Sequence, residues 1–421
     1  MIEILLSLGI FMSGVAAQSN YSNTTSNGTT IANCSAAFGN YTSNSTLGNC
    51  SYSINGSHPI NGTINGTILP LKQRKVFLDN DGLVPLNLIL PLLGGMEVVG
   101  VSGSFGDPSL PDAMGQAADV LSNYSVSECI PLYAGASQPF LRTQSTFETW
   151  ESLFGELVWK GAWDPGYKDS YNLSDVEYND DIPAAMALIQ AAKKYPGELE
   201  IYAAGLMTTV AQAVSMWPEL VDNVKALWIM GGYVDFQYLQ VTGDSMVNDI
   251  NTDFNLMFDP EAAEKVLTAG FQKVYIGGNV TNYLFPPQSM FDKFIDEFTY
   301  EEITSDPQLF AISSFIGTGN ASDVSLPLWD EAVSAYMAFP EFITDTTEVS
   351  VAVDTAFESP FYGNLRVWPY TFKPKRGRWA NATYVNSVDH EAIYEKIYSA
   401  LALDWSTYCA KNSTVYPYQT K

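Results

Sequence analysis

The chain has 421 residues, of which 46% are hydrophobic, and this is enough for one large or two ordinary domains with a substantial core. Its 46 acidic and 20 basic side chains give a formal net charge of -26. A chain this acidic repels phosphate backbones, which argues against a nucleic-acid partner. The charge suits cations and neutral small molecules as ligands, and it equally suits a surface that only keeps a secreted protein soluble.

The first residues predict a cleavable signal peptide over residues 1–18. Residues 4–17, ILLSLGIFMSGVAA, are apolar and end in small residues, although Glu3 stands where a basic residue is usual. The stretch is too short to span a bilayer, and no later stretch is apolar enough to do so. The polar carboxyl end, STVYPYQTK, does not resemble a lipid-anchor signal.

Residues 19–71 predict a disordered, N-glycosylated, low-complexity arm. No Asp, Glu, Lys or Arg lies between Glu3 and Lys72, and ten N-x-[S/T] sequons begin between Asn20 and Asn65. A segment of this composition cannot bury a core of its own. The expected location is therefore secreted, either extracellular or in a cell wall. Six further sequons begin at Asn123, Asn172, Asn279, Asn320, Asn381 and Asn412.

Four cysteines allow two disulfides in an oxidising compartment, with three possible pairings. Pairing Cys34 with Cys50 would close a loop inside the arm. Pairing Cys129 with Cys409 would tie the end of the chain to the folded domain. Neither a CxxC motif nor a cluster of cysteine and histidine is present, which argues against a zinc site.

Apolar strands and amphipathic helices alternate from Lys72 onward, which predicts one α/β domain over residues 72–421. Strands buried on both faces read as unbroken apolar runs, so we expect a mostly parallel sheet with helices on both faces. The expected strands are residues 75–79, 97–104, 129–134, 198–204, 225–230 and 272–277.

Two of the expected helices have clear ends. Residues 182–195 repeat alanine and isoleucine at helical spacing and stop before Pro196-Gly197. In residues 259–270, Asp259 suits the N-cap, Pro260 the first helical position and Gly270 the end.

Polar or glycine-rich residues follow four of these strands, as Asp79-Asn80-Asp81, Gly106-Asp107, Gly205 to Thr208, and Met230-Gly231-Gly232. Ligands of open α/β sheets bind at the carboxyl ends of the strands. The four strand ends therefore predict a single crevice.

Five segments in order resemble the nucleoside hydrolase family over roughly residues 74–370: LDNDG, AGLMTTVAQAV, WIMGGYVD, TDFNLMFDPEAA and PLWDEAVSAY. The resemblance implies a Rossmann-like nucleoside hydrolase fold and a small-molecule ribonucleoside as substrate. It also implies hydrolysis of the N-glycosidic bond, and a homodimer or tetramer. A calcium ion is expected to hold the ribose hydroxyls and a water, because calcium accepts many oxygen ligands with loose geometry.

The resemblance assigns roles to individual residues. Asp81 matches the general base, which is also a calcium ligand, and Asp79 matches its supporting neighbour. Thr208, through its main-chain carbonyl, and Asp330 match further calcium ligands. The substrate contacts that it implies are Met230, Asp253 and Asn255 on the ribose, with Asp253 shorter than the usual Glu, and Asp107 on the 2′-hydroxyl.

The leaving base is expected to be a purine. One branch of the family places a histidine just before the distal Asp, but here that residue is Trp329, and His58 and His390 match no such place. Tryptophan at this position resembles the purine-preferring branch, in which indoles stack on the base. Trp150 falls near the second stacking position of that branch.

The family's second acid pair is missing, because Pro85 and Leu86 stand in its place. A shift of one residue would let the amide oxygen of Asn87 serve as a weaker ligand. The run 83–93 itself reads as a buried helix. Fewer carboxylates predict weaker calcium binding. Three interpretations follow: an active nucleoside hydrolase with a reduced cage, an inactive binding or structural glycoprotein, or a hydrolase of a different ribosyl substrate that uses a weaker or different cation. Residues 235–251, after Met230, are a candidate lid over the pocket or a surface loop, and their acids Asp244 and Asp249 are candidate replacement ligands.

Overall fold

A computed structural model describes residues 74–411, except for 158, 235–252, 310–326 and 373. The predicted signal peptide, the glycosylated arm with Cys34 and Cys50, and the candidate lid lie outside the described residues. Within the described part of the chain, no helix is both long and apolar enough to cross a bilayer.

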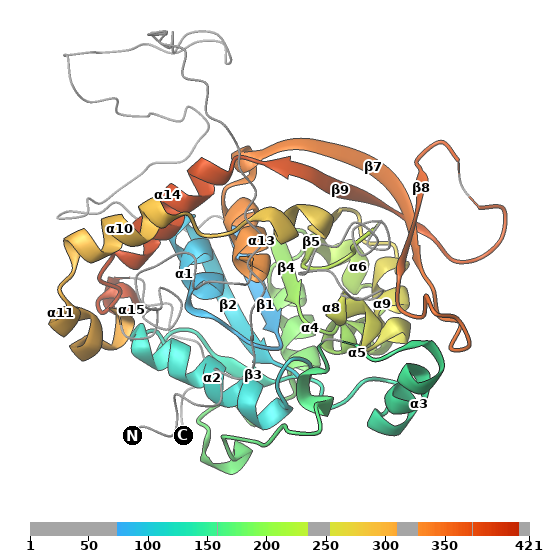
Figure 1. The fold of residues 1–421 in the computed structure, drawn as a ribbon, viewed down its shortest axis with the longest axis horizontal. Helices are drawn as coiled ribbons and strands as arrows, with labels where there is room; N and C mark the ends of the chain where they lie inside the picture. Colours follow the sequence, from blue (N-terminus) through green and yellow to red (C-terminus); the bar gives the residue numbers. More distant parts are fainter. Residues whose placement is uncertain (1–73, 158, 235–252, 310–326, 373, 412–421) are drawn as a thin grey trace, which may run out of the picture. The chain divides into compact units, whose positions relative to one another are not determined.

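The centre of the fold is a nine-stranded sheet with the order β3-β2-β1-β4-β5-β6-β9-β7-β8 (Figure 1). Neighbouring strands are parallel from β3 through to β9, and β7 is antiparallel to both β8 and β9. The strands are β1 Arg74–Asn80, β2 Met96–Gly103, β3 Leu132–Ala134, β4 Leu199–Ala204, β5 Val224–Ile229, β6 Val274–Ile276, β7 Ile343–Val353, β8 Leu365–Pro369 and β9 Ala380–Val388.

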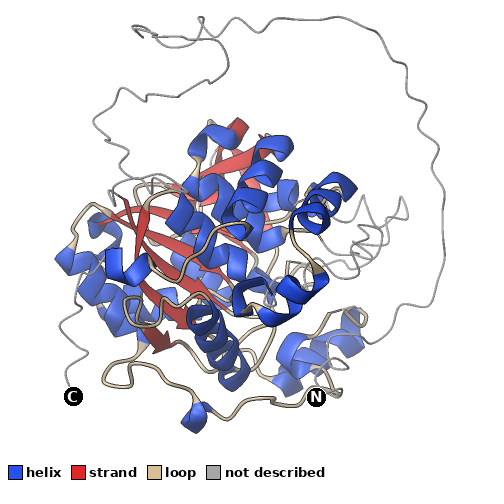
Figure 2. Ribbon diagram, turned by 90° about the vertical axis from the view of Figure 1, so that its left-hand side faces the viewer, coloured by secondary structure: helices blue, strands red, loops and turns tan. Residues whose placement is uncertain are grey.

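Helices lie on both sides of the strands, as Figure 2 shows. The α-helices are α1 Pro85–Leu93, α2 Leu110–Asn123, α3 Gln144–Phe154, α4 Ala184–Lys194, α5 Thr208–Met216, α6 Leu220–Asn223, α8 Phe254–Met257, α9 Pro260–Leu267, α10 Gln288–Glu297, α11 Tyr300–Ser305, α13 Trp329–Ala338, α14 His390–Leu401 and α15 Tyr408–Lys411. The short 3-10 helices are η2 Gly161–Trp163, η3 Leu173–Asp175, η5 Gly278–Tyr283 and η7 Pro340–Phe342.

The sheet separates two hydrophobic cores. In β1, Val76 and Leu78 belong to one core while Phe77 belongs to the other, as the two-residue period of a strand requires. Helices α1, α2, α13 and α14 pack on the first side, and α4, α5 and α9 on the second. The predicted parallel sheet with helices on both faces is therefore confirmed.

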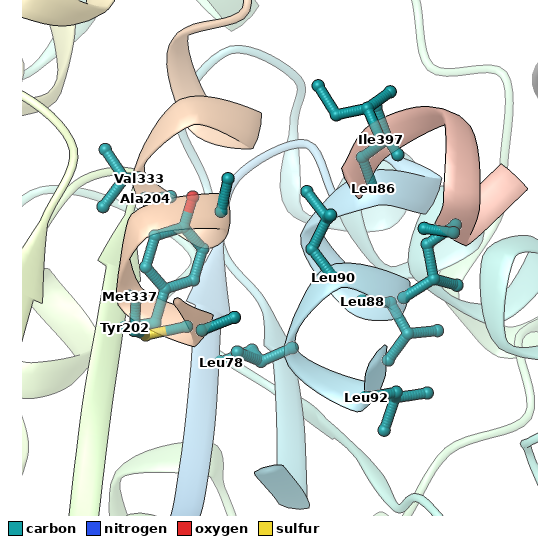
Figure 3. Close-up of a cluster of buried hydrophobic side chains, with 14 of the residues drawn as sticks. Leu78, Leu86, Leu88, Leu90, Leu92, Tyr202, Ala204, Val333, Met337 and Ile397 are labelled. Carbon is teal, nitrogen blue, oxygen red and sulfur yellow. The ribbon is translucent and has the colours of Figure 1, made fainter. Parts of the chain in front are cut away.

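The apolar run after Asp81 is a buried helix, as predicted. Pro85 is the first residue of α1, and residues 86–92 are all buried. Leu86, Leu88 and Leu90 pack with α13, α14, β1 and β4 (Figure 3). Burying one such side chain stabilises the fold by roughly 1.5–3 kcal/mol. Leu86 thus contributes to the core at a position where the resemblance implies an acid.

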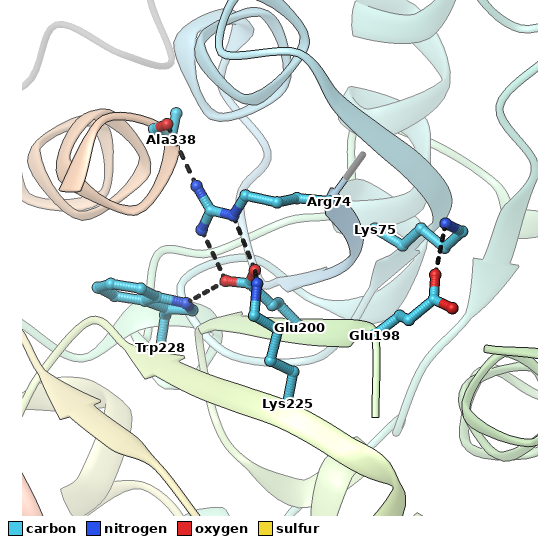
Figure 4. Close-up of polar contacts among 7 residues, drawn as sticks. All are labelled: Arg74, Lys75, Glu198, Glu200, Lys225, Trp228 and Ala338. Carbon is cyan, nitrogen blue, oxygen red and sulfur yellow. Dashed lines mark hydrogen bonds and ion pairs between the residues drawn. The ribbon is translucent and has the colours of Figure 1, made fainter. Parts of the chain in front are cut away.

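An ion cluster around the buried Glu200 joins the amino ends of three neighbouring strands (Figure 4). Arg74 of β1 pairs with Glu200 of β4 at 2.7 Å, Lys225 of β5 reaches Glu200 at 3.1 Å, and the Trp228 indole donates to it at 2.8 Å. The carboxylate is only 2% exposed. Burial alone would raise its pKa, but Arg74, Lys225 and Trp228 outweigh burial and hold the Glu200 pKa below its usual value.

The predicted helices were correct within two residues at their starts. α4 runs from Ala184 to Lys194, and Asp259 caps α9 by accepting from Ala262 N at 3.1 Å. Gly270 has the expected positive φ of +98°, although α9 already ends at Leu267. The sequence pattern did not indicate the antiparallel strands β7 to β9. Of the possible cysteine pairings, the structure contains Cys129–Cys409, with Cα atoms 5.5 Å apart.

Candidate active site

Asp81 occupies a narrow space at the carboxyl end of β1. Its backbone N–H donates to Ala204 O at 3.2 Å, and its Oδ2 accepts from Asp107 N at 3.0 Å. A Cβ added at Gly106 would lie 1.9 Å from Asp81 Oδ2, and one at Gly205 would lie 2.8 Å from Asp81 N. The two glycines therefore let adjacent chain segments close around this carboxylate.

The carboxylate of Asp330 meets the same edge of the sheet from the first turn of α13. Its Oδ2 accepts from Asn80 Nδ2 at 3.0 Å and from Asn87 Nδ2 at 3.1 Å. Tyr202 OH donates to the Asp330 carbonyl at 2.9 Å. The fold thus brings the end of β1, the first turn of α1 and the start of α13 together.

Three acids at this edge, Asp79, Asp81 and Asp330, have raised pKa values, chiefly because the surrounding protein removes water from their carboxyl groups. Burial, followed by the charges of Asp107 and Asp330, raises the Asp81 pKa well above its usual value. Burial raises the Asp330 pKa to about 7, opposed by the hydrogen bond from Asn80. Burial raises the pKa of Asp79 to about 7, opposed by the hydrogen bond from Ser102 Oγ, which donates to Asp79 Oδ1 at 2.6 Å. The carboxylates of Asp81, Asp107 and Asp330 therefore form one interacting group.

The oxygen donors at this edge suit a hard cation, although acids alone do not form a cage. In the described part of the chain, no group of three or more Asp, Glu, His or Cys is arranged to hold a metal. Asn87 adds an amide oxygen: its Oδ1 is buried and accepts no hydrogen bond from the residues that the structure describes. Carboxylate oxygens beside an unsatisfied amide oxygen are the kind of mixed donors that hard cations bind.

Thr208 starts α5 and is buried. Its Oγ1 donates to Asp259 Oδ2 at 2.7 Å, and the same Asp259 oxygen accepts from Phe140 N at 2.9 Å. Asp259, which is also the N-cap of α9, thereby ties together three segments around the start of α5. Burial raises the Asp259 pKa to about 6, opposed by the Thr208 hydrogen bond.

Met230, Asp253 and Asn255 form a second group, at the end of β5. Asn255 Nδ2 donates to Met230 O at 3.1 Å, so these two predicted ribose contacts are adjacent. Asp253 accepts from the backbone N–H of Gly232 at 2.6 Å and of Tyr233 at 3.1 Å, and it caps α8. In this structure the Asp253 carboxylate is engaged by the backbone, and its predicted contact with ribose stays a prediction.

The Trp329 side chain is half-buried at the first position of α13, beside Asp330. Its indole N–H donates to Asn282 Oδ1 at 2.7 Å, which fixes the orientation of the ring. Asn282 was not among the predicted residues, and its own amide nitrogen is buried and unpaired within the described residues.

Trp150 is fully enclosed in the protein interior. Its side chain has no exposed surface and packs in an aromatic cluster that includes Phe147 and Trp163. Its indole N–H donates to Ser359 O at 3.1 Å, and Arg142 lies over the ring at 5.2 Å. An indole enclosed in this way offers no face to a base, so the stacking role assigned to Trp150 is corrected.

The structure identifies Trp159 as a tryptophan that the sequence interpretation missed. Its side chain is 58% exposed, and its indole N–H donates to Asp107 Oδ1 at 2.6 Å. Asp107 is itself exposed, and the protein packed beside its carboxyl group raises its pKa to about 6 by desolvation, opposed by this hydrogen bond. No motif in the sequence marks Trp159, although it lies only nine residues beyond Trp150.

A family model described as inosine-uridine preferring nucleoside hydrolase matches residues 76–395. An uncharacterized protein of Schizosaccharomyces pombe is 42% identical over 346 residues, covering 82% of this chain and 89% of that protein. A pyrimidine-specific ribonucleoside hydrolase, RihB of Escherichia coli, is 24% identical over 217 residues, covering 50% of this chain and 62% of its own length.

Solved structures agree on the fold. A purine-preferring ribonucleoside hydrolase from Gardnerella vaginalis superposes with a TM-score of 0.56 at 20% identity, covering 78% of this chain and 98% of its own. A plant nucleoside hydrolase superposes with a TM-score of 0.57 at 20% identity, and the alignment covers 78% of this chain and 99% of the plant enzyme. The family match begins within β1 and ends within α14, and so includes Asp81 and Asp330. The chain belongs to the inosine-uridine preferring nucleoside hydrolase family.

Proposed function

We propose that this protein is a secreted ribonucleoside hydrolase that depends on calcium and prefers purine nucleosides. Membership of the family supports hydrolysis of the N-glycosidic bond of ribonucleosides. The observation that carries the proposal is the group formed by Asp81, Asp107 and Asp330 at the carboxyl edge of the sheet. This group of three acids is present although Pro85 and Leu86 stand where the family resemblance implies a further acid pair.

Each residue of the group has a role that its position supports. Asp81 can accept a proton from the attacking water, because its carboxylate lies at the carboxyl end of β1 within the acid group. The negative charge of Asp107 and Asp330 favours the oxocarbenium-like transition state of glycosidic cleavage. Asp81, Asp330, Asn87 and the Thr208 carbonyl would hold the calcium ion. When bound, calcium would polarise the water and the ribose hydroxyls.

The proposed preference for purines rests on indoles and on the absence of a nearby histidine. Of the residues that the structure describes, His390 is the one histidine, and it begins α14 and contacts Tyr394. Trp329 adjoins Asp330, and Trp159 adjoins Asp107, so an indole accompanies each of two acids of the group. Two indoles can stack on a purine and favour its protonated form, which leaves more readily.

The test is release of free base by the full-length protein. Inosine, guanosine, uridine and cytidine are incubated with the wild type and with Asp81→Asn, with calcium and after its chelation. We expect faster cleavage of inosine and guanosine, loss of activity on chelation, and a fall of at least about 100-fold in Asp81→Asn, as expected when a general base is removed. Equal activity of Asp81→Asn and the wild type would refute the assignment of Asp81.

A second candidate function is nucleoside binding without turnover. It is favoured by the replacement of the acid pair by Pro85 and Leu86 and by the lack of a three-acid metal group within the described residues. Thermal stabilisation by inosine without release of hypoxanthine would identify such a protein, because even weak binding to the native state raises its stability at high ligand concentration.

The proposal of secretion rests on the sequons and on the Cys129–Cys409 disulfide, a bond typical of oxidising compartments. Asn172 and Asn381 are exposed. By contrast, both ends of the Asn279 side-chain amide are engaged: its Oδ1 accepts from Val234 N, and its Nδ2 donates to Val234 O. In protein isolated from its native host, we expect mass spectrometry to find glycans at Asn172 and Asn381 but not at Asn279. Unmodified asparagine at all three positions would contradict passage through the secretory pathway.

A further inference from the structure

The 159–171 segment connects the candidate active site to helix α2. It begins with Trp159, whose indole N–H binds Asp107. Next, Ala162 N donates to Gly106 O at 3.1 Å, while Gly161 adopts a positive φ of +51° against the Phe254 ring. These contacts place the start of the segment directly on the loop that encloses Asp81.

The far end of the segment is held by Asp112, in the first turn of α2. Asp112 is 4% exposed and accepts three hydrogen bonds: from Tyr167 OH at 2.5 Å, from Ser170 N at 2.8 Å and from Tyr171 N at 2.8 Å. No ion pair in the described part of the chain includes Asp112. Its charge is therefore balanced by these donors and by the N-terminus of α2.

A second contact shows that the packing of the segment on α2 is tight. A Cβ added at Gly115 would lie 2.2 Å from the Tyr171 ring, so α2 has a glycine where the segment crosses it. The Tyr171 hydroxyl extends further along the helix and donates to Asp119 at 2.6 Å. The bond to Asp119 is solvent-exposed, whereas those to Asp112 are largely shielded.

We propose that Asp112 is a positioning residue: through the 159–171 segment it holds Trp159 against Asp107 and thereby sets the affinity for the nucleoside. The proposal rests on the proposed function, in which Asp107 and Trp159 face the substrate. Asp112 does not touch the reacting atoms. Removing it frees two backbone N–H groups and one hydroxyl, so the segment loses its anchor and Trp159 its fixed place.

The experiment compares Asp112→Ala with two reference variants. In Asp112→Asn the Oδ1 that serves Ser170 and Tyr171 is kept, so function should be largely retained. In Asp119→Ala only the exposed bond to Tyr171 is lost, so the kinetics should match the wild type. For Asp112→Ala acting on inosine we expect KM to rise about tenfold, a change worth about 1.4 kcal/mol, with kcat within about twofold of the wild type.

A double-mutant cycle distinguishes positioning from general destabilisation. Trp159→Phe alone should raise KM, and adding Asp112→Ala to it should have little further effect, because both changes act through the same indole. A fall in kcat at unchanged KM, or an undiminished effect of Asp112→Ala in the Trp159→Phe background, would overturn the proposal. If Asp112→Ala does not fold, Tyr167→Phe, which removes one of the three hydrogen bonds to Asp112, takes its place in the cycle, and an unchanged KM in that variant would overturn the proposal.

Fluorescence separates failure of this proposal from failure of the proposed function. The emission of Trp159 is obtained as the difference between the wild type and Trp159→Phe. We expect Asp112→Ala to make this emission more accessible to acrylamide, whether or not the protein cleaves any nucleoside. Unchanged quenching would overturn the positioning role. If the wild type cleaves no nucleoside but the quenching changes as expected, the anchoring stands and the hydrolase assignment fails.

Discussion

Replacing Asn87 with aspartate should make the protein less stable without calcium, and it should also increase the affinity for calcium. In Asn87→Asp, the Nδ2 that donates to Asp330 at 3.1 Å becomes an oxygen that repels it. The lost bond to a charged group is worth about 1.5–3 kcal/mol. With an unfolding entropy on the order of 0.7 kcal/mol/K for a chain of this size, Tm should fall by about 2–4 °C in chelator.

Calcium should reverse this loss, because the new carboxylate is a stronger ligand than the amide oxygen. A Kd tightened about tenfold adds about 1.4 kcal/mol at saturating calcium, or about 2 °C beyond the shift of the wild type. Scanning calorimetry in chelator and in calcium measures both effects. Asn87→Leu is the control, since it should lose stability without gaining a calcium response. The reasoning is wrong if calcium raises the Tm of Asn87→Asp no more than that of the wild type.

Two further changes test the packing of the site and the ion cluster of β1. Gly106→Ala places a Cβ 1.9 Å from Asp81 Oδ2 and should reduce the rate of base release by about 100-fold. Gly82→Ala is the control and should keep full activity, because its Cβ would meet nothing closer than 3.9 Å. Equal activities of the two variants would contradict the packing argument. Because the Glu200 pKa is lowered on folding, its contribution to stability is present above its unfolded pKa of about 4.3 and is lost as pH falls through the lower folded value. Arg74→Met should lower the free energy of unfolding by about 3 kcal/mol at pH 7 and make that free energy less dependent on pH between 5 and 3. Urea titrations at several pH values measure both effects. If the pH dependence of Arg74→Met equals that of the wild type, the ion pair does not lower the Glu200 pKa.

The parallel part of the fold was predictable because each of its strands is buried on both faces and therefore reads as an apolar run. Strands β7 to β9 escaped the same reasoning. In β7 the residues from Thr344 to Glu348 are exposed, and their polar sequence does not contrast with a loop. Their pairing with β9 also depends on contacts between distant segments, which local periodicity does not report.

The candidate site was predictable where chemistry is concentrated at strand ends, as at Asp79 and Asp81. Asn87 is an intermediate case, because the one-residue shift brought an amide into consideration, but its contact with Asp330 joins residues 243 positions apart. Trp159 could not be distinguished from Trp150 by sequence spacing. The turn at Gly161 and its contact with Gly106 decide which indole faces the acids, and both are properties of the folded chain.

Calcium titration followed by inosine hydrolysis on the same samples tests most directly whether the acid group at this sheet edge is a working metal-dependent site. Metal-free wild type and Asp330→Asn are titrated by calorimetry, and base release is then measured at each calcium concentration. We predict that the wild type binds calcium weakly, that hydrolysis rises in proportion to occupancy, and that Asp330→Asn loses both. Hydrolysis by the metal-free wild type, or calcium binding that Asp330→Asn leaves unchanged, would contradict the proposed role of this acid group.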